Sequence, residues 1–319
     1  MIRPDEILRI LDMQNNRFYS LNEFLRNRHG EKILKLSIDG GFTCPNRDGR
    51  ISSKGCLFCS ERGSGDFTFY EKGNITLQLQ EASKLLENKW GTGRKYIAYF
   101  QAFTNTYDSL DILKAKYEEA LAFPGVIGLA IATRPDCLSD EIIDYLAELS
   151  QRTHLWIELG LQTIHEETAH LINRGYSLDC FEKAVYKLAK HNIEVVVHLI
   201  LGLPGESKEH MLASARYIAQ LPLQGVKLHM LHILDNAPLG IYYKQHPFPL
   251  LNEEEYIALI GDILSLLPPE FVIHRLTGDG SRVHLIGPLW TIHKKQVLNH
   301  ITQYLKAHDI YQGKSLKRC

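Results

Sequence analysis

Residues 33–60 read ILKLSIDGGFTCPNRDGRISSKGCLFCS. Residues 33–38 form an apolar run typical of a buried strand, and a Gly-rich loop follows it. The loop contains Cys44, Cys56 and Cys59 with the spacing C-x11-C-x2-C. Three thiolates can hold a four-iron cluster and leave one iron without a protein ligand. Such an open iron is a site for chemistry.

Structural zinc and a disulfide are the alternatives for this loop. Structural zinc requires a fourth Cys or His, but His29 precedes the strand and residues 60–94 contain neither residue type. Disulfides are rare in reducing compartments, and the six cysteines show no framework-like spacing. We therefore favour the cluster and regard Cys137, Cys180 and Cys319 as bystanders.

The composition indicates a large globular protein. The chain has 319 residues, 45% of them hydrophobic, and a formal charge of -1. It can bury the core of one substantial domain or of a domain with an extension. The N-terminus has no apolar signal region, and no later stretch approaches the ~20 apolar residues that span a bilayer. We expect a cytoplasmic protein without a membrane partner.

The charge distribution is informative about partners. Proteins that hold a polynucleotide by its phosphates usually concentrate Lys and Arg on one surface. Here basic and acidic residues are interleaved, and only residues 314–318 form a short basic tail. Charge therefore does not support a nucleic-acid partner, although it does not exclude one. The oligomeric state cannot be predicted.

Apolar runs alternate with helix-period segments after a predicted helical lead-in at residues 4–28. The predicted strands are residues 33–37, 96–100, 126–132, 155–160, 195–201, 226–231 and 271–276. The predicted helices include residues 77–89, 111–122, 140–149, 181–191 and 208–220. Ser139 and Asn252, the latter with Glu255 three residues on, are helix start signals. This alternation predicts an α/β fold with a parallel sheet buried on both faces, as a barrel or partial barrel.

Polar loops follow several predicted strands. In such barrels the reactive groups lie on the loops after the carboxyl ends of the strands. Besides the cysteine loop, these are residues 101–107, 133–136 and 202–206. We expect these loops to meet in one pocket. Residues 235–249, which contain Pro and Gly, are the predicted seam before a C-terminal extension.

Several sequence strings resemble those of the radical S-adenosylmethionine (SAM) superfamily, and more narrowly the YhcC/YtqA-like family. Besides the long first gap of the cysteine loop, they are residues 63–67, 100–102, 104–107, 132–136, 158–162, 173–175, 202–206, 274–280 and 311–313. The resemblance covers nearly the whole chain. It implies a lead-in at residues 1–32, a partial (β/α)6 TIM-like barrel at residues 33–235 and a C-terminal α/β extension or lid at residues 236–319.

The resemblance also implies the cofactors. Cys44, Cys56 and Cys59 are expected to hold a [4Fe-4S] cluster, while SAM's amino and carboxylate groups chelate the fourth iron. An external electron donor of the flavodoxin or ferredoxin type reduces the cluster. Transfer of that electron to the sulfonium cleaves a C-S bond and releases a 5'-deoxyadenosyl radical. The protein must position the substrate and exclude quenchers.

Site roles follow from the loops that match. Phe58 is expected to lie near the adenine of SAM, and Gly202 and Leu203 are expected at the adenine edge. The methionine moiety is expected to contact Gln101, Thr104 and Asn105. The ribose and carboxylate are expected to contact Thr133, Arg134, Glu158 and Gln162. A planar guanidinium suits a carboxylate, but Arg134 could instead pair with Asp136. His198, His229, Arg275 and Asp279 are predicted to face the substrate, although a lone strand histidine is more often a satisfied core group.

The predicted activity is radical cleavage of a C-N bond. No second cysteine cluster is present, which disfavours chemistry that needs an auxiliary iron-sulfur centre. Two families resembling this one cleave at a secondary amine: queuine lyases, which release 7-aminomethyl-7-deazaguanine, and enzymes that modify the wobble uridine of tRNA.

The choice of substrate rests on two observations. The chain has no basic stripe, and it departs from the family's usual residues at 235–237, Ser281, His293 and Lys295. These departures would fit an altered pocket, and Asp279 or Glu158 could accept hydrogen bonds from a deazaguanine edge. We therefore predict queuine lyase first, tRNA modification second, and a non-catalytic iron-sulfur protein third.

Overall fold

The protein is described here by a computed structural model that covers residues 16–63, 65, 74–91, 93–278 and 280–316. Its main sheet has the strand order β1-β2-β3-β4-β5-β6-β8. The strands are β1 (Leu34–Ile38), β2 (Tyr96–Phe100), β3 (Val126–Thr133), β4 (His154–Gln162), β5 (Glu194–Leu201), β6 (Gly225–Met230) and β8 (Val272–Arg275). The pairs β1/β2, β2/β3, β3/β4 and β6/β8 are parallel. The order therefore follows the chain, as expected for successive βα units.

Helices connect most of these strands, and further helices precede and follow the sheet. The α-helices are α2 (Leu21–His29), α3 (Ile75–Trp90), α4 (Leu110–Ala122), α5 (Asp140–Arg152), α6 (Glu166–Leu171), α7 (Leu178–Lys190), α8 (Lys208–Ile218), α9 (Pro238–Gln245), α10 (Glu253–Leu266) and α11 (Lys294–Ala307). The 3-10 helices are η1 (Pro135–Cys137) and η2 (Leu289–His293). A small second sheet pairs β7 (Ile233–Leu234) antiparallel with β9 (Leu285–Gly287).

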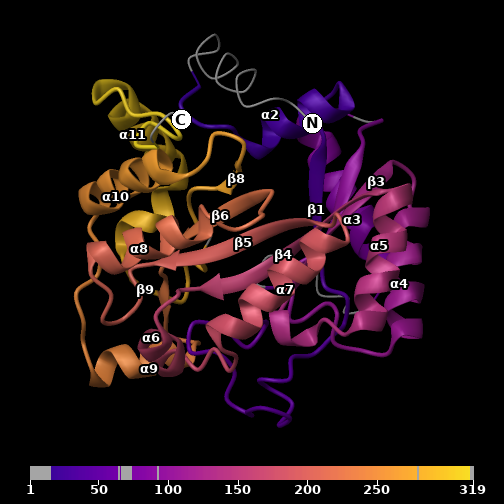
Figure 1. The fold of residues 1–319 in the computed structure, drawn as a ribbon, viewed down its shortest axis with the longest axis horizontal. Helices are drawn as coiled ribbons and strands as arrows, with labels where there is room; N and C mark the ends of the chain where they lie inside the picture. Colours follow the sequence, from indigo (N-terminus) through magenta and orange to yellow (C-terminus); the bar gives the residue numbers. More distant parts are fainter. Residues whose placement is uncertain (1–15, 64, 66–73, 92, 279, 317–319) are drawn as a thin grey trace. The chain divides into compact units, whose positions relative to one another are not determined.

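The chain folds into two compact units. One contains residues 25–160 and 174–196; in it α3 packs against β1 and α4, and α4 packs against β3 (Figure 1). All five residues of β2 are buried. Strands buried on both faces are apolar along their whole length, which explains the continuous run YIAYF in this strand.

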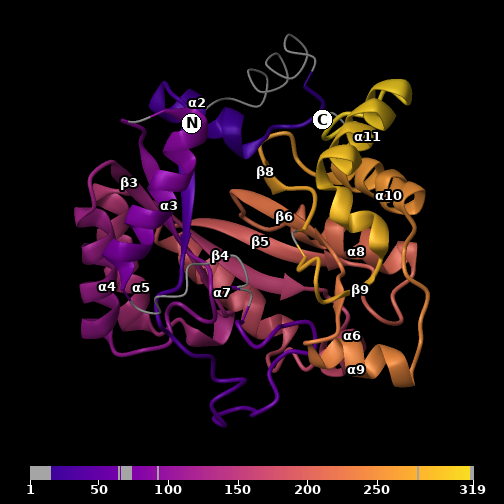
Figure 2. The same cartoon turned by 180° about the vertical axis from the view of Figure 1, so that it is seen from behind.

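The other unit contains residues up to 24, 161–173 and 197 onward. Here α10 packs against α8 and α11 (Figure 2). Helix α10 begins with a capping box, because the Asn252 side chain accepts from the Glu255 N–H and the Glu255 side chain accepts from the Asn252 N–H. Asn252 was one of the two predicted start signals. The other, Ser139, caps α5 in the first unit by accepting from the Ile142 N–H.

The predicted strands and helices agree with the observed elements to within a few residues at each end, except for the lead-in. Residues 16–20 are not helical, and α2 begins only at Leu21. The prediction of one helix through residues 4–28 was therefore wrong at residues 16–20, and residues 4–15 lie outside the described part. Ser20 explains the late start: its hydroxyl accepts from the Glu23 N–H, and Ser20 itself bridges to Ile273 of β8.

Several elements were not predicted from the sequence. They are α6, α9, α11, β7 and β9, and α9 lies within the predicted seam at residues 235–249. The boundaries predicted at residues 32 and 235 stay predictions. Among the described residues, no helix has the length and apolar character needed to cross a lipid bilayer.

A polar network lies at the amino ends of β4 and β5. His29 Nε2 is 3.0 Å from His154 Nδ1, and His154 Nε2 is 3.2 Å from the Glu194 carboxylate. Arg28 donates to the other oxygen of Glu194 at 2.5 Å. Burial alone would raise the pKa of Glu194, but its bonds with His154 and Arg28 outweigh burial and lower it. Burial, followed by repulsion from His154, lowers the pKa of His29.

Because both pKa values are lowered in the folded protein, its free energy of unfolding is greater at neutral pH than at acidic pH. His29 favours its neutral form, so its contribution is complete above its ordinary pKa of 6.5 and declines as pH falls below that value. The Glu194 contribution is complete above 4.5 and is lost as pH falls through its lower folded pKa.

We predict that Glu194→Gln lowers the free energy of unfolding at pH 7 by about 1–3 kcal/mol, between the values for exposed and buried ion pairs. The difference from the unsubstituted protein should shrink below pH 4.5, because that protein then also loses the charged pair. Urea unfolding followed by circular dichroism at pH 7 and pH 4 measures both effects. Glu209→Gln is the control, because its ion pair with Arg216 is exposed. Equal losses in both variants at pH 7 would contradict the role of the network.

Candidate functional site

The cysteine loop connects β1 to α3 and is held by hydrogen bonds of its own backbone. The Cys44 carbonyl accepts from the Arg47 N–H at 2.8 Å, and the Cys56 carbonyl accepts from the Cys59 N–H at 3.1 Å. The Arg47 guanidinium donates to the carbonyls of Cys59 and Glu61 at 3.2 and 3.1 Å. One side chain thus links the turn at Cys44 to the turn at Cys56 and Cys59, in spite of the long gap between them.

The three thiols form no disulfide and are half-buried. A hydrogen bond with the Cys59 thiol, followed by burial, raises the pKa of Cys56, whereas Arg134 and Asn46 lower it. Cys56 and Cys59 are therefore neighbours in space. Among the described residues, no three His, Cys, Asp or Glu side chains converge on one metal position. An iron-sulfur cluster does not require such convergence, because each thiolate binds a different iron.

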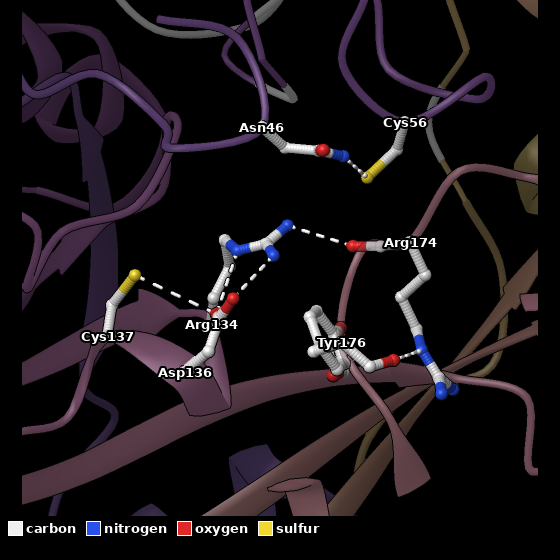
Figure 3. Close-up of polar contacts among 8 residues, drawn as sticks. Asn46, Cys56, Arg134, Asp136, Cys137, Arg174 and Tyr176 are labelled. Carbon is white, nitrogen blue, oxygen red and sulfur yellow. Dashed lines mark hydrogen bonds and ion pairs between the residues drawn. The ribbon is translucent and has the colours of Figure 1, made fainter. Parts of the chain in front are cut away.

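Asn46 lies beside the sulfur of Cys56 (Figure 3). Its Nδ2 donates to Cys56 Sγ at 3.4 Å, within the range of a hydrogen bond to sulfur. Asn46 is fully buried, and its backbone carbonyl accepts from the Gly55 N–H at 2.7 Å. The amide is therefore held against the thiol by the same loop that presents the cysteines.

Arg134, at the end of β3, connects two further loops. Its Nε and Nη2 donate to the two carboxylate oxygens of Asp136 at 2.9 and 2.7 Å, and its Nη1 donates to the Arg174 carbonyl at 3.0 Å (Figure 3). Only 7% of Arg134 is exposed, and a buried charge is stable only when it is paired and hydrogen-bonded. The ion pair that the sequence left open as an alternative is thus present, and the guanidinium fork binds Asp136.

Tyr176 lies between two guanidinium groups. The Arg134 and Arg174 guanidinium carbons are 4.7 and 4.9 Å from the centre of its ring, within the range of cation–π contacts. Its hydroxyl donates to the Gly160 carbonyl at 2.6 Å, and Arg174 Nε donates to its carbonyl at 3.0 Å. Burial, followed by the nearby Cys56, raises the pKa of Tyr176. Of these two buried cations, Arg134 is the one whose charge acts on Cys56, where it opposes the rise in pKa.

Gly175 allows this close packing. It has φ +80°, and a Cβ at this position would lie 3.1 Å from Asn46 Oδ1 and 3.4 Å from Arg134 Nη2. Only glycine adopts this backbone conformation without strain. The turn at Gly175 thus sets the distance between residues 174–176 and Asn46.

The loop after β2 contributes Thr104 and Asn105, both buried. The Asn105 amide donates to the carbonyls of Phe100 and Ala132 at 3.1 and 2.8 Å. Its Oδ1 is buried without a hydrogen-bond partner in the described structure. A buried acceptor without a donor is costly unless a ligand supplies one, so Asn105 fits a ligand that carries N–H groups.

The remaining predicted cofactor residues of this unit have varied surroundings. Phe58 is half-buried in the turn between Cys56 and Cys59, and the Gln101 N–H donates to the Ile38 carbonyl. The Thr133 hydroxyl is 2.5 Å from the Thr106 hydroxyl. Glu158 is fully buried, where it accepts from Trp156 Nε1 at 3.0 Å and pairs with Lys35 Nζ at 3.5 Å.

The other predicted site residues belong to the second compact unit. Gln162 has φ +67° at the end of β4, the Gly202 N–H contacts Met211 Sδ at 3.1 Å, and Leu203 is buried.

The residues predicted to face the substrate also lie in the second unit. The rings of His198 on β5 and His229 on β6 are 5.2 Å apart. Arg275 on β8 is the register partner of Lys227 on β6, which is buried. The fourth predicted residue, Asp279, lies outside the described residues.

A hollow of about 670 Å³ adjoins the cysteine loop in the first unit. Loop residues 43–51 form one wall, and residues 106–108 and 136–142 form the others. On its rim the Arg50 guanidinium lies 5.8 Å from the centre of the Tyr107 ring.

Three residues of this site have contacts that the sequence did not predict. Asn46 contacts Cys56 within the cysteine loop, whereas Arg174 and Tyr176 contact Arg134 from the loop between α6 and α7. A signal existed for Arg174, since residues 173–175 were among the strings shared with the family. Nothing local distinguishes Asn46 from an ordinary turn residue.

Comparisons with known proteins identify the family. The family model of the radical SAM superfamily matches residues 46–218, and that of the radical SAM C-terminal domain matches residues 223–307. The chain is 45% identical to the uncharacterized protein YtqA of Bacillus subtilis, over 96% of this chain and 98% of that protein. It is 34% identical to protein YhcC of Escherichia coli, over 92% of this chain and 94% of that protein.

More distant relatives share part of the chain. A tRNA uridine(34) acetyltransferase of Dehalococcoides mccartyi is 28% identical over 54% of this chain and 39% of that protein. Among solved structures, the archaeal Elp3 of Methanocaldococcus infernus matches with a TM-score of 0.66 and 18% identity, over 88% of this chain and 64% of that one.

The family and structural matches confirm the predicted partial (β/α)6 TIM-like barrel of the radical SAM type. The chain therefore belongs to the radical SAM superfamily, in the group that includes YtqA and YhcC, and its cofactors are a [4Fe-4S] cluster and S-adenosylmethionine.

Proposed function

We propose that Cys44, Cys56 and Cys59 hold the [4Fe-4S] cluster of a radical SAM enzyme that cleaves a C-N bond. The observation behind this proposal is that one loop presents three free thiols near the buried guanidinium group of Arg134, whose charge acts on Cys56. An iron-sulfur cluster bound by thiolates is anionic, and nearby positive charge favours the bound thiolates. The residues present therefore fit the group.

SAM would bind at the loops that follow β2 and β3. Asn105 Oδ1 is a buried acceptor suited to the ammonium group, and Thr104 lies beside it in sequence. Arg134 would act on SAM by holding Asp136 and the Arg174 carbonyl in place, because its fork already binds Asp136. When bound, the two cofactors supply a carbon radical that removes a hydrogen atom from the substrate. An external flavodoxin or ferredoxin would supply the electron.

The substrate we propose is queuine, a free modified deazapurine base, cleaved to 7-aminomethyl-7-deazaguanine. The supporting observation is charge: 36 Lys and Arg residues are interleaved with 37 Asp and Glu residues, without the basic surplus that binds polynucleotides. Cleavage beside a secondary amine suits a carbon radical, because the adjacent nitrogen stabilises the radical formed. His198, His229, Arg275 and Asp279 are the proposed substrate contacts.

A tRNA wobble-uridine side chain is the second candidate substrate. It is favoured by partial similarity to proteins named tRNA uridine(34) acetyltransferase. The departure from the family at residues 235–237 gives less support to an altered pocket than the sequence indicated. Asp235 pairs with His284 at 2.7 Å, and both side chains are more than 40% exposed. That departure from the family is explained by a surface ion pair.

A matched pair of glycine variants tests whether Gly175 positions the cysteine loop. Gly175→Ala and Gly205→Ala both place alanine at a positive φ, of +80° and +81°, but a Cβ at Gly205 meets no atom within 4 Å. Both should lose about 1 kcal/mol of stability from backbone strain. Only Gly175→Ala should also lower the iron bound after anaerobic reconstitution. Equal iron content in the two variants would contradict the role of Gly175.

Replacement of one thiol tests the ligand assignment. Cys56→Ala should abolish the visible absorption of the reconstituted cluster and the cleavage of SAM, because an iron with too few ligands is lost. Cys137→Ala should keep both, since we assign that cysteine no ligand role. Absorbance at reconstitution and chromatographic detection of 5'-deoxyadenosine are the measurements. Retained activity in Cys56→Ala would exclude Cys56 as a ligand.

The substrate is tested by stimulation of SAM cleavage. Anaerobic protein with reductant should form 5'-deoxyadenosine faster with free queuine, and mass spectrometry should detect 7-aminomethyl-7-deazaguanine. If only total tRNA stimulates cleavage, the second candidate replaces the first. No cleavage with either substrate would favour a non-catalytic iron-sulfur protein. Total tRNA treated with ribonuclease is the control for contaminating small molecules.

A further inference from the structure

We propose that Asn46 sets the reduction potential of the cluster by donating a hydrogen bond to the sulfur of Cys56. This inference rests on the proposed function, in which Cys56 is a cluster ligand. Asn46 is a positioning residue in this proposal: it acts on the cluster through Cys56 rather than on SAM or the substrate.

The contact is direct and shielded. Asn46 Nδ2 lies 3.4 Å from Cys56 Sγ, and no part of Asn46 is exposed to solvent. Hydrogen bonds in a buried environment are electrostatically stronger than in water. A water molecule therefore cannot readily replace the amide as a donor to this sulfur.

The surrounding residues restrict the position of the amide. On its backbone side, the Asn46 carbonyl accepts from the Gly55 N–H at 2.7 Å. The side-chain oxygen of Asn46, Oδ1, lies close to Gly175: a Cβ atom added to Gly175 would be 3.1 Å from this oxygen. Gly175 is in turn held between Arg174 and Tyr176, whose contacts with Arg134 are described above. The amide thus has little room to turn away from the sulfur.

Reduction adds one negative charge to a cluster whose thiolate sulfurs already carry much of the charge. An N–H donor to sulfur stabilises the reduced form more than the oxidised form, so it raises the reduction potential. The buried Arg134, whose charge acts on Cys56, favours the reduced form in the same way. Removal of the donor alone should therefore make the cluster harder to reduce.

The experiment measures the midpoint potential of the reconstituted cluster in Asn46→Ala and Asn46→Asp. Anaerobic redox titration followed by electron paramagnetic resonance gives the ratio of reduced to oxidised cluster. At a fixed applied potential we expect this ratio to fall about threefold to tenfold in Asn46→Ala, a shift of about 30–60 mV for a one-electron couple. Asn46→Asp should shift further, because it adds a negative charge of similar shape beside the sulfur.

A matched control separates this effect from a general loss of stability. Asn252→Ala removes an amide that caps α10 by accepting from the Glu255 N–H at 2.9 Å. It should cost about 1 kcal/mol of stability without moving the potential. Cleavage of SAM by Asn46→Ala should be slow with dithionite and should recover with the stronger reductant titanium(III) citrate.

The direction of the shift decides between this role and a merely structural one. A variant that only loosens the loop admits water to the cluster, and that exposure shifts the potential to more positive values. An unchanged or more positive midpoint in both variants would overturn the proposal. If Asn46→Ala binds no iron, Asn46→Asp supplies the decisive value, and loss of iron in both variants also overturns it. Failure of the unsubstituted protein to bind a cluster would instead refute the proposed function.

Discussion

The buried ion pair of Arg134 with Asp136 is the interaction on which the arrangement of the site depends. A guanidinium removed from water must bind a carboxylate and further acceptors, or its burial costs several kcal/mol. Arg134 satisfies this requirement with Asp136, the Arg174 carbonyl and the face of Tyr176. Loops that follow different strands therefore have one mutual position in which the charge is satisfied.

The same arrangement creates an environment suited to an anionic metal centre. Arg134 and Arg174 both contact the ring of Tyr176, and the charge of Arg134 acts on the loop that carries three thiols. Arg47 and Asn46 contact the loop from within, through backbone carbonyls and through the Cys56 sulfur. The loop is thus organised by hydrogen bonds and charges from the protein, with each cation also engaged in holding the fold.

Much of the fold was predictable because its signals are local. The run YIAYF matches β2 residue for residue, and the Asn252 and Ser139 start signals lie at the observed helix caps. The prediction of a helix was wrong at residues 16–20, because the β-bridge between Ser20 and Ile273 joins positions far apart in the chain. Elements β7 and β9 were missed for a similar reason, since two strands of two and three residues are stable only when paired.

The sequence by itself determined the chemistry of this protein. The cysteine spacing, the alternation of strands and helices and the sequence motifs shared with the family can all be read without knowing which distant residues are in contact. The tertiary structure alone decided what surrounds that chemistry. It paired Arg134 with Asp136, it turned Asn46 toward Cys56 within the cysteine loop, and it brought Tyr176 near Cys56 from a separate loop. The physical reason is that ligand type is a property of single residues, whereas charge pairing and hydrogen bonding to sulfur depend on distances that only the packed chain sets.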